Sequence, residues 1–379
     1  MKRWFCMFAA CMWMIPAAIA ERTARTNDIY QETPYTLTIQ GETYTGMAQV
    51  TRTFPEQMSR LIGKGAKGNQ EEVAEDMFTR LGLPAQQMKA AQNPENSSHY
   101  YLGDSPYGSD RGSAIHFSGP DVRYFEQPVK MDEYWNSGVM VFTDEKGSVI
   151  ETNTATRIYL DLDLDWRALP EIAGTGFPRQ IDKVYEMVEC AGMDAGGIMT
   201  LAYWDGQTLE RNRQREMEES GAEYARKTPW SDADACVLIY MPVYVEGIPL
   251  QYESSGGYPD TLYHHCCGVE ACVTQDSVVY ISMVGRLQDL RADGQAERVL
   301  TPEEILARYE EYLNQLLAVT DEMREIGCIR LEYSVWNTLE RGNFWPDIHL
   351  DPVWSIYWKK SGNHPAVVFD ALTGEMIFW

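Results

Sequence analysis

Alternating hydrophobic and polar residues run along much of the chain and predict β-strands. Residues 35–50 read YTLTIQGETYTGMAQV, and their alternation around Gly41 and Gly46 predicts a strand pair. Residues 157–166 alternate most strictly, with apolar side chains on one face and Tyr159 and three aspartates on the other. Further strands are expected at residues 113–118, 122–127, 138–143, 197–204, 236–245, 329–336, 353–358 and 366–379, and a hairpin is expected at 268–285.

Apolar residues spaced three or four apart predict helices between these strands. Such helices are expected at residues 69–82 and 180–190, and the highly charged residues 208–226 are expected to form a helix or a solvated arm. The longest one begins after Thr301, because Pro302 suits a first turn and Glu304 completes a capping box with Thr301. Its apolar stripe continues to Met323. Residues 87–112 are polar and rich in Asn, Ser and Gly, which favours a long loop.

The order of these elements predicts an α+β fold. Runs of strands interrupted by single helices are typical of a helix packed on an antiparallel sheet. The length of 379 residues suits two such domains of roughly 100–200 residues each. We therefore expect an N-terminal α+β domain at residues 21–175 and a C-terminal one at 176–379.

Residues 1–20 have the pattern of a secretory signal peptide. Lys2 and Arg3 precede an apolar run, and Ala18-Ile19-Ala20 offers small residues for cleavage before Glu21. The apolar run is shorter than the ~20 residues that span a bilayer, which argues against a retained anchor. A lipid on Cys11 is the alternative. We expect an extracytoplasmic protein, secreted or held at the cell surface, that touches a membrane only through an uncleaved or lipidated N-terminus.

The charge of the chain excludes one class of partner. Asp and Glu number 56 against 32 Lys and Arg, which gives a net charge of −24. Such a surface repels the phosphates of nucleic acids and anionic lipid head groups. Hydrophobic residues still make up 44% of the chain, enough for ordinary cores, so the acidity indicates a solvated surface and not disorder.

Cysteine and histidine gather in the stretch YHHCCGVEAC at residues 263–272. A metal ion is one interpretation of this stretch, with candidate ligands His264, His265, Cys266, Cys267 and Cys272. Adjacent Cys266 and Cys267 are poorly placed to face one ion, and an oxidising compartment favours disulfides over metal thiolates. The disulfide candidates are Cys190, Cys236, Cys266, Cys267, Cys272 and Cys328. A catalytic thiol is the weakest interpretation, because an exported thiolate is readily oxidised.

Other motifs point to no catalytic or cofactor-binding residue. The stretch GKGAKG at residues 63–68 matches a dinucleotide-binding pattern, but a buried strand is not expected before it, so it is interpreted as a turn. The aspartates of residues 161–165 lack the glycine turn and distal glutamate of a calcium loop. Neither a G-x-S-x-G nor an H-E-x-x-H sequence occurs. We expect no cofactor.

The C-terminal part resembles a known family. The turn VYVEGIPL at residues 243–250, the strand LDPVW at 350–354 and the closing segment VVFDALTGEM at 367–376 resemble PepSY-type extracytoplasmic domains, particularly YycH/YycI-like proteins of Gram-positive bacteria. This resemblance covers residues 228–379. It implies helix-on-sheet modules that bind or restrain other proteins and have no catalytic residues.

These observations favour a non-catalytic binding or regulatory protein of the bacterial cell envelope. Its expected partner is another envelope or secreted protein or a peptide. The alternative function is a secreted hydrolase whose catalytic site assembles only in the fold, because a spatial arrangement of His or acidic residues has no signature in sequence spacing.

Overall fold

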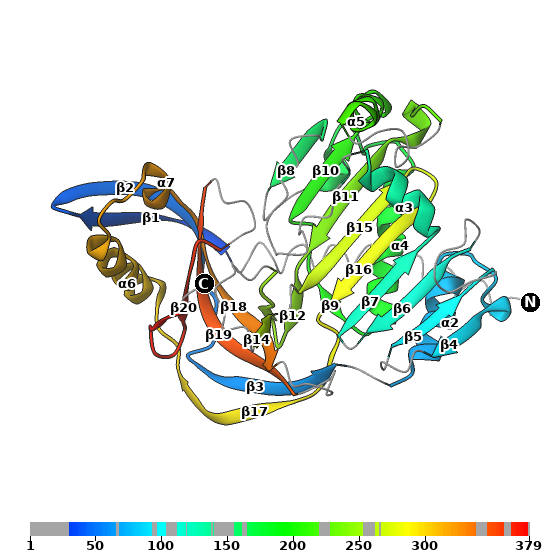
Figure 1. Ribbon diagram of the computed structural model, residues 1–379. Helices are drawn as coiled ribbons and strands as arrows, with labels where there is room; N and C mark the ends of the chain where they lie inside the picture. Colours follow the sequence, from blue (N-terminus) through cyan, green and yellow to red (C-terminus); the bar gives the residue numbers. More distant parts are fainter. Residues whose placement is uncertain are drawn as a thin grey trace, which may run out of the picture.

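The computed structural model describes residues 30–65, 68–92, 97–103, 112–118, 120–137, 139, 155–160, 165–219, 228–252, 262–264, 267–338, 347–359 and 365–377. Their strands form two nine-stranded sheets and one three-stranded sheet, accompanied by α-helices and short 3₁₀ helices (Figure 1). The predicted α+β class is therefore confirmed.

The first large sheet, called sheet A, joins both ends of the described chain. Its strands run in the order β1, β2, β18, β19, β20, β21, with β14 beside β18 and β3 between β19 and β17. Their bounds are β1 (Tyr30–Ile39), β2 (Glu42–Thr51), β3 (Gln57–Gly65), β14 (Leu262–His264), β17 (Leu287–Arg298), β18 (Ile326–Thr338), β19 (Ile348–Trp358), β20 (Val367–Asp370) and β21 (Met376–Ile377). Neighbours pair antiparallel except β2 with β18.

The second large sheet, called sheet B, is antiparallel throughout. Its order is β4 (Lys89–Gln92), β5 (Ser98–Tyr101), β6 (Ala114–Ser118), β7 (Asp121–Phe125), β16 (Val278–Val284), β15 (Gly268–Thr274), β11 (Cys236–Met241), β10 (Thr200–Trp204) and β8 (Arg157–Leu160). A small third sheet contains β13 (Ile248–Pro249), β12 (Val243–Val245) and β9 (Asp194–Ala195). The predicted hairpin at 268–285 is β15 and β16.

Helices cover both faces of sheet B because its central strands are apolar on both sides. Helix α4 (Phe177–Cys190) packs on β15 and β16, and α2 (Gln70–Arg80) packs on α4. On the opposite face, residues of α3 (Pro128–Trp135) and α5 (Gly206–Glu219) join a second hydrophobic cluster that includes Trp204 and Trp230. The burial of β11 on both faces is what its continuous apolar sequence predicts.

Helix α6 (Pro302–Gln315) packs beside β1 of sheet A, and a local sequence signal sets where it begins. The Thr301 hydroxyl accepts a hydrogen bond from the amide of Glu304, whose carboxylate accepts one from the Thr301 amide, as the predicted capping box requires. The helix ends at Gln315, before the predicted Met323. Asn314 exchanges hydrogen bonds with the backbone of Thr38 and Gln40, which fastens the last turn to β1. The short helix α7 (Asp321–Arg324) follows.

Several other expectations differ from the structure. The predicted loop at 87–112 contains β4 and β5, and the predicted turn at 63–68 begins inside β3. Strand β17 and helix α3 were not expected: β17 is polar and largely exposed, and α3 is short, so neither has a strong hydrophobic period. Of the predicted strand at 157–166, β8 covers the first part, residues 161–164 lie outside the described residues, and Trp166 is buried in a 3₁₀ helix (Trp166–Ala168).

Both large sheets take strands from either side of residue 175. Sheet A combines β1–β3 with β17–β21, and sheet B combines β4–β8 with β10, β11, β15 and β16. Buried hydrophobic residues from both sheets belong to one cluster, which includes Leu37, Val237 and Trp354. The fold therefore brings distant parts of the chain together along the boundary between the sheets.

Candidate functional site

A group of polar side chains lies on β18 and β19 at the boundary between the sheets. Along β18, Ile329 and Leu331 join the hydrophobic core, so Arg330 and Glu332 project from the opposite face. In the β19 register, Ser355 lies opposite Arg330 and Tyr357 lies opposite Cys328. We call Gln251, Arg330, Glu332, Ser355 and Tyr357 the inter-sheet cluster.

Glu332 is the buried carboxyl group of this cluster, with 3% of its surface exposed. The Tyr357 hydroxyl lies 2.8 Å from Glu332 Oε2 and 3.1 Å from Oε1, and donates its hydrogen bond to the carboxyl. Burial raises the pKa of Glu332, whereas Arg330 and the hydrogen bonds from Ser355 and Tyr357 lower it, and the net direction is upward. The carboxyl group is thus placed to hold a proton at a higher pH than an exposed glutamate.

Arg330 is the cation of the cluster. Its Nε donates to Cys328 Sγ at 3.1 Å, and its Cζ lies 4.5 Å from the ring centroid of Tyr357 and 6.0 Å from that of Tyr30. Burial lowers the pKa of Arg330, but the neighbouring Cys328, Tyr357, Tyr30 and Glu332 raise it, with a net increase. Within the described part of the chain, Arg330 forms no ion pair. The guanidinium therefore remains charged, and Glu332 interacts with it electrostatically without forming a salt bridge.

Residues 250–252 connect this cluster to sheet B. The Gln251 amide donates to the Tyr333 carbonyl at 2.9 Å, and Gln251 Nε2 donates to Ser355 Oγ at 3.1 Å. Next along the chain, the Tyr252 hydroxyl donates to Glu270 on β15, and the Tyr252 ring centroid lies 3.9 Å from that of Tyr240 on β11. Polar and aromatic groups of the two sheets thus form one continuous buried region.

From this region a row of polar residues crosses sheet B. Tyr240 pairs with Glu270, Glu270 with Ser282, Ser282 with Arg123, Arg123 with His116, and His116 with His99. Directly opposed residues in neighbouring strands lie on the same face of a sheet. The side chain of Arg123 is 51% exposed, and the His99 and His116 ring centroids lie 4.3 Å apart. The row leads from the buried inter-sheet region past the exposed Arg123 to the buried His99.

Asp121 lies beside this row on β7. Its Oδ1 is buried without a hydrogen-bond partner among the described residues, and its Oδ2 lies 3.8 Å from Arg123 Nη2. Burial raises the pKa of Asp121 to about 6, against a smaller lowering by Arg123. The charged form of Asp121 is therefore less favourable than the charged form of a solvated aspartate.

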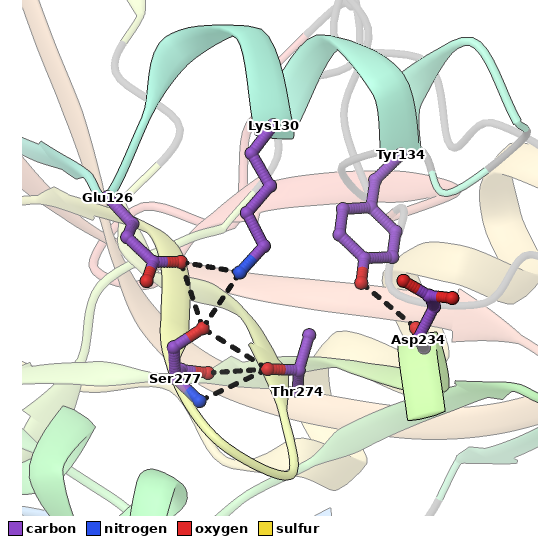
Figure 2. A network of polar contacts seen from close by, with 6 residues as sticks. All are labelled: Glu126, Lys130, Tyr134, Asp234, Thr274 and Ser277. Carbon is purple, nitrogen blue, oxygen red and sulfur yellow. Dashed lines mark hydrogen bonds and ion pairs between the residues drawn. The ribbon is translucent and has the colours of Figure 1, made fainter. Parts of the chain in front are cut away.

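A second polar network fastens α3 to the turn between β15 and β16 (Figure 2). Lys130 Nζ lies 2.7 Å from Glu126 Oε2 and 3.0 Å from Ser277 Oγ, and Ser277 Oγ lies 3.2 Å from Thr274 Oγ1. At the other end of α3, the Tyr134 hydroxyl donates to the Asp234 carbonyl. A lysine that serves as a base for serine must be deprotonated, whereas the ammonium here pairs with Glu126. The network therefore holds the helix in place and offers no activated nucleophile.

The predicted metal ligands are only partly described. His264 lies in β14 opposite Trp336, Cys267 and Cys272 are buried in or beside β15, and His265 and Cys266 lie outside the described residues. Within the described ranges, no group of three His, Cys, Asp or Glu side chains could hold a metal ion. The metal interpretation stays a prediction, because two of its five candidates are not described.

The predicted disulfides do not appear among the described residues. Cys190, Cys236, Cys267, Cys272 and Cys328 are all free thiols. Cys190 Sγ donates to Asp76 Oδ2 at 2.8 Å, and burial and this carboxylate raise the Cys190 pKa to about 12. Cys328 contacts Arg330, whereas Cys236 and Cys272 hydrogen-bond to each other. The structure thus places Cys236 and Cys272 close enough to interact.

The motifs that carry the PepSY resemblance fall in turns and strands around sheet A. Residues 243–250 form the β12–β13 hairpin, whose turn has positive φ at Glu246 and Gly247. Residues 350–354 lie in β19, and residues 367–376 form the β20–β21 hairpin, where Asp370 Oδ1 accepts from the Leu372 and Thr373 amides. In the parts of the chain that the structure describes, no helix is long and apolar enough to cross a membrane.

The fold defines an α+β protein built on large antiparallel sheets. A similar structure is that of an uncharacterized protein from Eubacterium rectale ATCC 33656, with a TM-score of 0.61 and 12% sequence identity over 95% of this chain and 98% of that chain. No protein-family model and no curated protein matches the sequence. The likeness to the Eubacterium rectale protein shows a common fold.

Sequence reasoning missed the inter-sheet cluster, although one signal of it was present. Residues 329–336 read IRLEYSVW, so the predicted strand already placed Arg330, Glu332 and Ser334 on one face. An alternating strand suggests that such a charged face is solvated. Only the position of Gln251 and of sheet B, both distant along the chain, shows that this face is largely covered.

Proposed function

We propose that the protein is an exported, non-catalytic binding protein of the bacterial cell envelope whose inter-sheet cluster binds a carboxylate group of its ligand. The observation that carries this proposal is the charged guanidinium of Arg330, which forms no salt bridge among the described residues. In a chain of net charge −24, a cation held between tyrosine rings on a partly covered face is positioned to attract an anion. A planar guanidinium binds a carboxylate through two parallel hydrogen bonds.

The proposed export rests on residues 1–20, whose basic start, apolar core and Ala-Ile-Ala ending act together. The PepSY-type resemblance of residues 228–379 supports the same class of binding proteins and favours a peptide or protein as the source of the carboxylate. A free C-terminus or an acidic side chain of such a partner supplies the required group.

A thermal-shift screen of the mature protein tests this proposal. The panel contains amino acids, dipeptides with free and with amidated C-termini, sugar acids and inorganic phosphate. We expect a carboxylate ligand to raise the melting temperature, and amidation of its carboxylate to abolish the shift. Arg330→Met should remove the shift, and Arg330→Lys should reduce it because lysine lacks the fork. Arg215→Met, on the exposed side of α5, is the matched control. An equal shift in Arg330→Met and wild type would refute the proposed site.

The alternative, a secreted hydrolase, is favoured by the raised pKa of Glu332. A buried carboxyl whose pKa lies above its ordinary value is a suitable general acid, and Tyr357 holds it in place. The matched variant is Glu332→Gln, which preserves the shape of the side chain. Turnover of an ester, peptide or glycoside that is present in wild type and lost in Glu332→Gln would favour this alternative over the binding function.

A further inference from the structure

Cys236 and Cys272 are placed together by the register of β11 and β15. Cys236 pairs with Thr274, and Cys272 pairs with Leu238, so the two cysteines are diagonal neighbours on one face of sheet B. The two thiols also interact with each other, as expected of side chains that share one face.

Both thiols lie in the second hydrophobic cluster, away from water. Neither side chain is exposed, and the cluster around them includes Tyr134 of α3, Trp204 of β10 and Trp230. Buried free cysteines in such a place commonly act as small apolar residues. In an oxidising compartment, however, two neighbouring thiols on adjacent strands can be joined once their Cα atoms come within about 7 Å of each other.

We propose that Cys236 and Cys272 form a modification site, a cross-strand dithiol that is oxidised to a disulfide joining β11 to β15. The inference rests on the proposed export, because a reducing compartment would keep both thiols reduced. The bond would enclose residues 237–271, which include Tyr240, Glu270 and Gln251 of the inter-sheet region. It would thereby fix the two strands of sheet B that contact the candidate binding site.

The oxidation is an exchange with an external disulfide, for example glutathione disulfide. One cysteine thiolate attacks the oxidant and releases one glutathione thiol, leaving a mixed disulfide. The second thiolate then attacks the protein sulfur of that mixed disulfide, forms the Cys236–Cys272 bond and releases the second glutathione thiol. Burial is the main reason that the pKa of Cys236 lies well above its usual value, and the neighbouring Cys272 adds to the effect. The thiolate is therefore scarce in the folded state. The exchange is therefore expected during folding, before the strands close.

The test uses full-length mature protein prepared in two ways. One sample is unfolded, reduced and refolded in a glutathione redox buffer, and the other is folded, reduced protein placed in the same buffer. Free thiols are alkylated, and peptides are analysed by mass spectrometry with and without reduction. We expect a linked peptide pair containing Cys236 and Cys272 in the refolded sample and little of it in the folded one. Refolded protein with both cysteines alkylated, or with Cys272 linked mainly to another cysteine, would overturn the proposal.

The natural culture separates this proposal from the proposed export. If the refolded protein forms the bond but native protein from the bacterium has both thiols free, its N-terminus decides: an intact Met1 means that the export proposal fails, whereas Glu21 means that the protein is exported without the bond and the disulfide proposal fails. Thermal unfolding adds a second readout. Oxidised wild type should melt several degrees above the reduced form, and this difference should vanish in Cys272→Ala and Cys236→Ala but persist in Cys190→Ala. An oxidation-dependent shift that survives in both single variants would also contradict the assignment.

Discussion

At the scale of single residues, Asp121 on β7 has a carboxyl oxygen with no hydrogen-bond partner among the described residues and a pKa raised to about 6, against an ordinary 3.8. A raised pKa means that the folded state binds the proton more tightly than the unfolded state. Ionised Asp121 therefore destabilises the fold above pH 6. This cost disappears as the pH falls through about 6 toward the ordinary value of 3.8.

Asp121→Asn should therefore stabilise the protein at neutral pH. About two pKa units correspond to at most ~3 kcal/mol, and loss of the contact with Arg123 reduces the gain. We expect a higher melting temperature for the variant at pH 7.5 and a difference that shrinks toward pH 4. The control is Asp276→Asn at an exposed turn position. A variant that is equally destabilised at both pH values would show that Asp121 is not held in an unfavourable charged state.

The residues of the inter-sheet cluster show where prediction from sequence ends. The alternation of residues 329–336 was sufficient to predict the strand, and β18 contains it. An alternating strand commonly has a solvated polar face, whereas Glu332 is almost fully buried. Burial of that face depends on Gln251 and on tyrosines of sheet B, whose proximity arises from tertiary contacts. A hydrophobic pattern describes one strand and has no information about what covers its polar side.

At the scale of elements, the capping box of α6 gives a direct test of a predicted feature. Thr301 accepts from the Glu304 amide, and replacement of an N-cap threonine by alanine typically costs about 1 kcal/mol. We expect Thr301→Ala to lower the free energy of unfolding by this amount in urea titrations at neutral pH. The helix should still form, because Ile305, Tyr309 and Leu313 remain buried against sheet A.

The matched control for this change is Thr79→Ala in α2. The Thr79 hydroxyl donates to the Glu75 carbonyl within the helix, at an exposed position, so its removal should change stability by less than about 0.5 kcal/mol. Equal losses in the two variants would mean that the capping box contributes nothing beyond a generic threonine-to-alanine effect.

Elements with local signals were the predictable ones. The helix after Thr301 and the hairpin of β15 and β16 have caps, turns and periodic side chains within their own sequences. Strand β17 lacks these signals: it is polar and exposed, and it exists because β3 provides its hydrogen-bonding partner. Helix α3 is held by contacts from Lys130 and Tyr134 to distant residues. Such elements depend on the whole fold, so a local pattern does not reveal them.

At the scale of the whole molecule, each large sheet combines early and late segments of the chain. The predicted α+β class needed only the order of elements, whereas the pairing of β2 with β18 joins residues about 280 positions apart, as the hydrogen bond from Leu331 N to Thr51 Oγ1 illustrates. The Eubacterium rectale protein has a similar fold at 12% identity. The arrangement therefore tolerates extensive change of individual residues.

Export of the chain is a prediction for the whole molecule. Signal peptidase should cleave after Ala20, because residues 18–20 present small side chains after the apolar segment. Mass spectrometry of protein from the natural culture should find Glu21 at the N-terminus. Lipid attached to Cys11 would instead indicate a surface lipoprotein. An intact Met1 in cytoplasmic protein would contradict export.

The central claim is that Arg330 binds a ligand carboxylate between the two sheets. Isothermal titration of the mature protein with the carboxylate that gives the largest thermal shift tests it most directly, comparing wild type, Arg330→Met and Arg215→Met. The account predicts one site per chain, unchanged affinity in Arg215→Met and at least about tenfold weaker binding in Arg330→Met, as loss of a charged bidentate contact implies. Affinity that is unchanged in Arg330→Met, with all three proteins folded, would contradict the account.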